Sequence, residues 1–171
     1  VNLNVGCPSK KVSQGRMGAC LMKEADIVRG CVQAMISESS SEVSVKCRIG
    51  VDEFESYNFF KEFISNVSDS GCNTFFVHAR KAFLKGLDPK KNRTLPPLKY
   101  DYVYKLKREM PQLNIIINGG IQTLEECHNQ LKSVDGVMIG RSIQANPFFL
   151  EEVDHQFYNQ KMRSLEKNQV I

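Results

Sequence analysis

A cysteine stands between a glycine and a proline where the first strand-like run of the chain ends. The run VNLNV is followed by GCPS, and glycine and proline together turn the chain sharply at Cys7. The other five cysteines lie within apolar patterns, where a thiol serves as a small apolar side chain. No histidine stands near Cys7 in sequence, and a thiol without such a partner is mostly protonated at neutral pH. The position therefore predicts a proton donor, with a nucleophile as the alternative.

A lysine and a histidine hold matching positions on two further strand-like runs. Lys46 lies within VSVKCRI (43–49), opposite its apolar face, and a lysine is rarely buried without a partner. His78 ends the next run, NTFFVHA (73–79). A flavin gains negative charge at its pyrimidine end on reduction, so a nearby ammonium group suits such a cofactor. A lysine that faces water and a structural histidine are the alternatives.

Glycines follow the last two strand-like runs. Asn118, Gly119 and Gly120 close one run, and Gly140 and Arg141 close the next. In (β/α)8 barrels the loops after the last two strands often bind a phosphate, and glycine lets the backbone N–H groups approach it. We expect such a phosphate site here, paired with the Arg141 guanidinium. Two tight turns that need glycine at positive φ are the alternative.

Positive charge is concentrated in one segment that directly follows His78. Residues 80–93, RKAFLKGLDPKKNR, carry a net charge of +5 (six basic residues and one acidic), whereas the whole chain has +4. Basic residues interleaved with an aromatic suit an RNA backbone and an unstacked base. A solvated charged face is the alternative. The basic side chains of this rim segment are Arg80, Lys81, Lys85, Lys90, Lys91 and Arg93.

Strand-like runs alternate with helical patterns along the chain, which favours an α/β fold with a parallel sheet. We expect strands at 1–5, 43–49, 73–79, 114–118 and 136–140, and helices at about 24–37, 56–70, 100–110, 123–131 and near Pro147. Thr123 followed by Glu126 fits a capping box at a helix start. One face of each strand is apolar and the other carries polar groups at its carboxyl end. This pattern predicts a (β/α)8 TIM barrel, of which these are the last five βα units.

Composition sets further expectations for the 171 residues. Apolar residues make up 42% and charged residues 25%, which is usual for a globular protein. The sequence contains no run of 18 apolar residues, so we expect no membrane span. The six cysteines form no C-x-x-C pair and no cluster with zinc-ligand spacing, so we expect reduced thiols and no metal. A cytoplasmic protein without a signal peptide is expected. An organelle is the alternative location, because the sequence starts within a strand and a targeting segment before that strand would not be seen.

Seven motifs occur in a fixed order: NVGCPS, GRMGACLM, VKCRIG, HARK, NRTLPPL, NGGI and GVMIGRSIQANP. In these motifs the chain closely resembles the tRNA-dihydrouridine synthases, and among them the A-type subfamily. The resemblance runs from residue 1 to about residue 153. It implies a flavin-dependent oxidoreductase that reduces uridine to 5,6-dihydrouridine in the D-loop of tRNA.

The resemblance also implies roles for individual residues. FMN, reduced by NADPH, passes a hydride to carbon 6 of the uracil, and Cys7 donates the proton to carbon 5. Asn4 resembles a uridine contact, and Arg48 is expected near the base. Lys46 and His78 match flavin contacts, and the residues that match the flavin and phosphate site are Asn118, Gly119, Gly120, Gly140 and Arg141. The basic side chains of the rim segment are expected to contact tRNA.

By the same resemblance, residues 1–153 are the C-terminal part of a flavin-binding barrel. Residues 154–171 are expected to be a linker or the start of a helical tRNA-binding domain. We expect a monomer with tRNA as its partner. Because early barrel strands and the helical domain are missing from these 171 residues, we expect the segment alone to bind FMN weakly and to have little activity.

Three other functions fit parts of the pattern. A flavin barrel oxidoreductase for a small molecule, such as a dihydroorotate or dihydropyrimidine dehydrogenase, shares the phosphate site and the lysine but needs no basic rim segment. An RNA-binding protein without catalysis would not need Cys7, Lys46 and His78. A flavin-free barrel, such as a sugar-phosphate isomerase, would not need Cys7.

Overall fold

The computed structural model describes residues 1–161 and builds them around one parallel sheet. The strands are β1 (Asn2–Asn4), β2 (Ser44–Arg48), β3 (Thr74–His78), β4 (Asn114–Asn118) and β5 (Gly136–Met138). Each strand pairs in parallel with the next one along the chain, so the order in space is the order in sequence. This is the arrangement of consecutive βα units of a barrel, and the predicted α/β fold class is confirmed.

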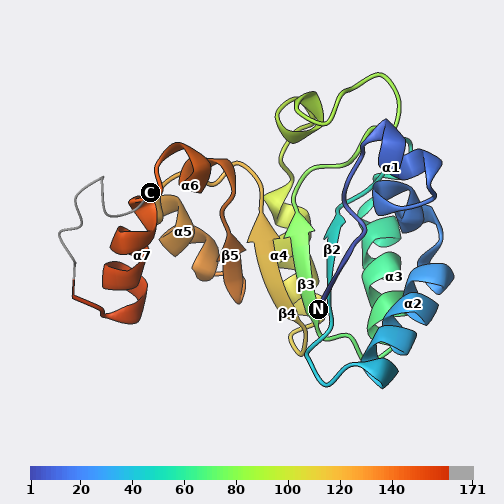
Figure 1. The fold of residues 1–171 in the computed structure, drawn as a ribbon, viewed down its shortest axis with the longest axis horizontal. Coiled ribbons are helices and arrows are strands. Elements are labelled where there is room, and N and C mark those ends of the chain that lie inside the picture. Colours follow the sequence, from blue (N-terminus) through green and yellow to red (C-terminus); the bar gives the residue numbers. More distant parts are fainter. Residues whose placement is uncertain (162–171) are drawn as a thin grey trace.

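Helices fill the connections between the strands (Figure 1). They are α1 (Lys10–Gln14), α2 (Ala25–Glu38), α3 (Tyr57–Ser68), α4 (Tyr100–Glu109), α5 (Leu124–Leu131), α6 (Arg141–Ala145) and α7 (Phe149–Tyr158), with 3-10 turns η1 (Gly18–Lys23) and η2 (Lys91–Arg93). In Figure 1, α2 and α3 run side by side along one flank of the sheet, and α5, α6 and α7 gather beyond β5. None of the helices in residues 1–161 combines the length and apolar character needed to cross a bilayer.

The core lies between the helices and one face of the sheet. Val45 and Cys47 of β2 and Phe75 and Val77 of β3 are fully buried, as the alternation predicts. They join a single apolar cluster with side chains from α2, α3 and α4, including Phe60. The residues between them point to the other face of the sheet. This division frees the second face for polar groups.

Local signals explain where two of the long helices begin. The Ser56 side chain accepts a hydrogen bond from Phe59 N (3.1 Å) at the start of α3. At α5, Thr123 accepts from Glu126 N (3.1 Å) while the Glu126 carboxylate accepts from Thr123 N (3.0 Å). The predicted capping box is therefore confirmed.

Helical structure near Pro147 is confirmed, but as two helices: α6 ends at Ala145 and α7 begins at Phe149. Pro147 lies in the break between them, and proline does not fit a helix interior. Helix α7 also runs across the predicted boundary between residues 153 and 154. Residues 162–171 of the expected helical or linker segment lie outside the described residues, so the division at 153 stays a prediction.

The core packing predicts a contrast between two phenylalanines. Phe60→Ala removes a ring that is 0% exposed and should lower the free energy of unfolding by about 3–5 kcal/mol. Phe54→Ala, whose side chain is 42% exposed, should cost about 1 kcal/mol or less. Urea unfolding of the protein measures both losses. Equal losses would show that the interface of α3 with the sheet is not a core.

Candidate active site

The strand register brings the polar side chains of the second sheet face to one level. Arg48 of β2 pairs with His78 of β3, His78 with Asn118 of β4, and Asn118 with Met138 of β5. Two residues before Arg48 along β2, Lys46 pairs with Asn4 of β1. Residues at the carboxyl ends of parallel strands share one edge of the sheet, so these groups meet there.

At this edge the structure has a pocket of about 640 Å³. Its volume lies within the range of small-molecule and cofactor sites. The sequence-predicted site residues that line it are Asn4, Cys7, Lys46, Arg48, His78, Arg93, Asn118, Gly119, Gly120, Gly140 and Arg141. The structure therefore brings the expected cysteine, the strand-end cations and both glycine turns together. Arg80, Lys81, Lys85, Lys90 and Lys91 are not part of its lining.

Cys7 is half-buried in a turn with several backbone hydrogen bonds. Gly6 N donates to the Asn4 side chain (3.0 Å), and Ala19 N donates to Cys7 O (2.8 Å). Gly18 has a φ of +71°, and a Cβ at this position would lie 2.5 Å from Cys7 O. Glycine at 18 therefore lets η1 close against the cysteine backbone. The result is a thiol on a turn of defined conformation at the pocket wall.

Lys46 is held across the sheet. Its Nζ donates to Asn118 Oδ1 (3.3 Å), and Asn118 Nδ2 donates to Met138 O (2.8 Å). This orients the Asn118 amide. Burial lowers the pKa of Lys46 from its ordinary value, and the neighbouring Arg48 charge lowers it further, with Cys47 acting in the opposite direction.

His78 is buried among cations. Burial, followed by the charges of Arg48, Lys46, Arg80 and Arg141, lowers the pKa of His78 to about 2. The imidazole is therefore neutral over the physiological pH range and carries one N–H donor and one acceptor nitrogen.

The glycine turns leave room that side chains would fill. Gly119 has a φ of +113°, and a Cβ there would overlap the His78 ring. A Cβ at Gly140 would have no atom within 4 Å, so the backbone there is open to the pocket. Arg141 lies just after it, and its Nη2 donates to Arg93 O (3.4 Å). Tyr100 fixes the first turn by donating from its hydroxyl to Gly119 O (2.5 Å).

The charges around the pocket are of one sign. Lys46, Arg48, Arg93 and Arg141 line it, and no carboxylate occurs among its described lining residues. Arg80 lies close enough to act on the pKa of His78, and its buried Nε has no hydrogen-bond partner in the described structure. Its Nη1 donates to Pro96 O. Such a site suits an anionic ligand.

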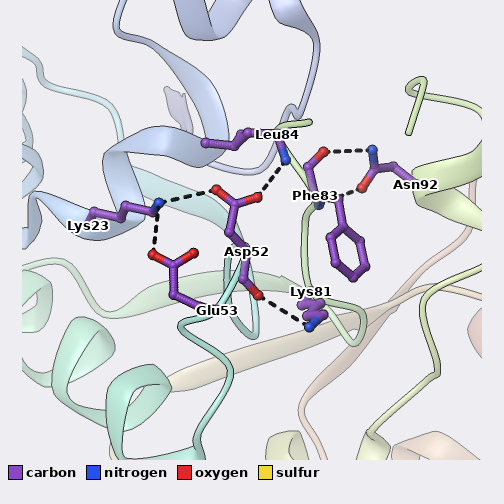
Figure 2. A network of polar contacts seen from close by, with 7 residues as sticks. All are labelled: Lys23, Asp52, Glu53, Lys81, Phe83, Leu84 and Asn92. Carbon is purple, nitrogen blue, oxygen red and sulfur yellow. Dashed lines mark hydrogen bonds and ion pairs between the residues drawn. The ribbon is translucent and has the colours of Figure 1, made fainter. Parts of the chain in front are cut away.

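The rim segment (residues 80–93) is an ordered loop. Figure 2 shows Asn92 bound to Phe83, and Asp52 bound to the next residue, Leu84. Asn92 is 0% exposed; its Oδ1 accepts from Phe83 N (2.8 Å), and its Nδ2 donates to Phe83 O (2.9 Å). Further bonds run from the same Nδ2 to Leu87 O and Asp88 O, both 3.2 Å. The amide therefore fixes both ends of the loop.

Asp52 supports the rim segment from the β2–α3 connection (Figure 2). Its Oδ1 accepts from Leu84 N (2.8 Å), and its Oδ2 pairs with Lys23 Nζ (3.1 Å). Asp52 N also donates to Ala82 O (2.7 Å). Asn92 and Asp52 were not among the sequence-predicted site residues. A neutral amide within the run KKNR was the one available signal for Asn92.

The six basic side chains of the rim segment fall into two groups. Lys81 pairs with Glu55 (2.8 Å) and donates to Asp52 O (3.2 Å), and Arg80 is half-buried. Lys85, Lys90, Lys91 and Arg93 are exposed. Only this second group is free to meet a large ligand from solvent.

Arg48 is placed differently from the expected base contact. It is 3% exposed, and its guanidinium donates to three backbone carbonyls, those of Gly6, Lys81 and Asn92. Burial lowers its pKa to about 10, which leaves the group cationic at neutral pH. Arg48 also borders the pocket, so the expected contact with a base stays a prediction.

Comparison with known proteins identifies the relatives of this chain. A family model described as "Dihydrouridine synthase (Dus)" matches residues 1–171. The tRNA-dihydrouridine(20/20a) synthase of Pasteurella multocida is 52% identical over 159 residues, which cover 93% of this chain and 49% of the relative. The synthase of the same name from Shewanella oneidensis is 55% identical over 154 residues, covering 90% and 46%. That of Vibrio cholerae is 49% identical over 172 residues, covering 100% and 53%.

The matches extend over nearly all of this chain but about half the length of these curated relatives. The family model includes both the cysteine turn and the glycine turns of the pocket. Seven ordered motifs, a parallel sheet in sequential order and a cationic pocket at its carboxyl edge all agree with this match. The chain belongs to the dihydrouridine synthase family.

Proposed function

We propose that the full-length protein containing this chain reduces uridine to 5,6-dihydrouridine in the D-loop of tRNA. The names of the relatives point to positions 20 and 20a. The observation that carries the proposal is the Cys7 turn, which lies at the wall of a cationic pocket lined by Lys46, His78 and Arg141. A monomeric state, a cytoplasmic location and a preference for NADPH stay predictions.

The pocket fits FMN in two respects. It is large enough, and it has cations and no carboxylate in its described lining. Lys46 and His78 would hold the flavin ring. The residues that would hold its phosphate side are Asn118, Gly119, Gly120, Gly140 and Arg141. FMN, when bound and reduced by NADPH, supplies the hydride for carbon 6 of the uracil.

Cys7 supplies the other hydrogen. Its Sγ–H bond breaks, the proton goes to carbon 5 of the base, and the thiolate left behind regains a proton from water. The hydride and the proton together saturate the carbon 5–carbon 6 double bond. Asn4 uses its side-chain oxygen on Gly6 N (3.0 Å), so its amide N–H groups remain as donors toward the base.

The exposed rim cations Lys85, Lys90, Lys91 and Arg93 would contact the tRNA backbone. A stacked uridine must leave its stack to reach the pocket, at a cost of a few kcal/mol that contacts elsewhere must offset. Because Asn92 and Asp52 order the rim segment in the free chain, less entropy is lost there on binding.

Replacing the acid should abolish the product. Cys7→Ala should lower dihydrouridine formation about 10²- to 10⁴-fold, because a positioned general acid contributes about that much. Mass spectrometry of the D-loop, in cells that lack their own dihydrouridine synthases, would show a gain of two hydrogens with wild type only. Cys31→Ala is the matched control, since Cys31 is exposed on α2. Full activity of Cys7→Ala would exclude the thiol as the acid.

Removing the pocket lysine should weaken flavin binding. Lys46→Met deletes a charged donor and should raise the Kd for FMN roughly ten- to hundredfold, since such a hydrogen bond contributes about 1.5–3 kcal/mol. Titration of the apoprotein, followed by flavin absorbance, measures the Kd. Lys132→Met is the control, because Lys132 is exposed at the end of α5. An unchanged Kd for the Lys46 variant would place the flavin elsewhere.

Neutralising the exposed rim cations should change the salt dependence of tRNA binding. The triple change Lys85→Gln, Lys90→Gln and Lys91→Gln should reduce the slope of log K against log salt by about one for each phosphate that is no longer neutralised. Filter binding at several salt concentrations measures the slope. Lys105→Gln with Lys132→Gln changes exposed lysines outside the rim segment and should leave the slope unchanged. The same slope in all three proteins would exclude the rim segment from the tRNA interface.

A further inference from the structure

We propose that Arg48 is the positioning residue for Cys7: its guanidinium fixes the Gly6–Cys7 turn and joins that turn to the rim segment. The inference deepens the proposed function and rests on it for the role of Cys7. It differs from the expected contact between Arg48 and the base. It assigns the arginine a role in the free protein, before any tRNA is present.

The hydrogen bonds of Arg48 join parts of the chain that lie far apart in sequence. Nε donates to Gly6 O (2.9 Å), directly before Cys7. Nη1 donates to Lys81 O (3.1 Å) and to Asn92 O (2.9 Å), near the two ends of the rim segment. One side chain from the end of β2 therefore holds three backbone segments at the carboxyl edge of the sheet.

Arg48 is buried without an acidic partner, and this environment favours an arginine over a lysine. Arg48 is 3% exposed, and the titratable groups that act on its pKa are the side chains of Cys7, Arg80 and Arg93, with no carboxylate among them. A buried charge is costly unless hydrogen bonds compensate it. The carbonyls of Gly6, Lys81 and Asn92 provide that compensation here. Planar guanidinium geometry serves several acceptors at once, which an ammonium does less well.

The turn at Cys7 is held from two sides. Ala19 N donates to Cys7 O (2.8 Å) from η1, and Arg48 holds the preceding carbonyl from β2. The Asn4 side chain accepts from Gly6 N (3.0 Å) within the same turn. With both peptide carbonyls bonded, the direction of the Cys7 side chain is restricted. Loss of the Arg48 bond would release one side of the turn, and a misplacement of about 1 Å can cost about a hundredfold in rate.

The same guanidinium joins the cysteine turn to the proposed tRNA contact. Asn92 holds both ends of the rim segment through its side chain, and its own carbonyl accepts from Arg48. Figure 2 shows that Asp52 also holds this segment through Leu84 and is itself paired with Lys23. The thiol and the ordered loop are therefore fixed to one buried side chain.

Arg48→Lys in the full-length flavin-bound protein tests the assignment, because it keeps the charge and removes the planar set of donors. Iodoacetamide modification of Cys7 is measured without tRNA by peptide mass spectrometry. The exposed Cys31 serves as the reference within the same molecule. We expect the ratio of Cys7 to Cys31 modification to rise several-fold. Arg29→Lys, which changes a half-buried arginine on α2 paired with Asp26 (3.2 Å), should leave the ratio unchanged.

Rapid kinetics separates positioning from binding. Oxidation of the reduced flavin by tRNA should slow about a hundredfold in Arg48→Lys, while flavin reduction by NADPH keeps its wild-type rate. An unchanged modification ratio together with weaker tRNA binding would overturn the proposal and favour the base contact. The modification ratio requires neither tRNA nor turnover. It therefore tests the position of Cys7 even where the wild-type protein leaves tRNA unmodified, a result that would refute the proposed function alone.

A second measurement uses the unchanged protein and covers the case in which Arg48→Lys does not fold, as judged by flavin content and circular dichroism. In ¹⁵N-labelled wild type, the Nε–H signal of Arg48 should be protected from solvent exchange before tRNA is added. Protection that appears only after tRNA is added would overturn the proposal, because the bond to Gly6 O would then not exist in the free protein.

Discussion

Positive charge gathered without a counter-charge is the constraint to which the rest of this structure responds. Lys46, Arg48, Arg93 and Arg141 border one pocket whose described lining includes no carboxylate. Like charges brought together in a partly buried site repel one another and lose hydration. The pKa values of Lys46, Arg48 and His78 are all lowered, as this environment requires. The fold must hold this arrangement together through contacts made elsewhere.

The pleat of the sheet allows the apolar core and the cationic pocket to lie on opposite faces, because successive residues of a strand point to opposite sides. Cys47 and Val77 are buried in the core, while their neighbours Lys46 and His78 face the pocket. Backbone carbonyls take over the role that carboxylates play in ordinary ion pairs. Those of Gly6, Lys81 and Asn92 satisfy Arg48 without cancelling its charge. The pocket therefore keeps a net positive field for an anionic ligand.

Sequence reasoning reached the parts of this design that depend on periodicity and on strand ends. Alternation within 43–49 placed Lys46 opposite Cys47, and the Gly119–Gly120 and Gly140 turns were found because glycine marks close backbone approach. The short elements α1, η1 and η2 were not expected, since three to six residues show no helical period. Asn92 was missed for another reason. Its role depends on bonds to Phe83, Leu87 and Asp88 that only the closed loop creates.

Charge alone also did not distinguish the two kinds of basic side chain in the rim segment. Lys81 and Lys91 look alike in sequence, yet Lys81 pairs with Glu55 (2.8 Å) whereas Lys91 is exposed. The difference comes from the β2–α3 connection, which brings Asp52 O and the Glu55 carboxylate within reach of Lys81 Nζ. Part of the positive run thus serves to hold the loop, and the remainder is left for a ligand.

Because His78 is neutral and Arg48 stays charged between pH 5 and 8, their contribution to the field of the pocket does not change over that range.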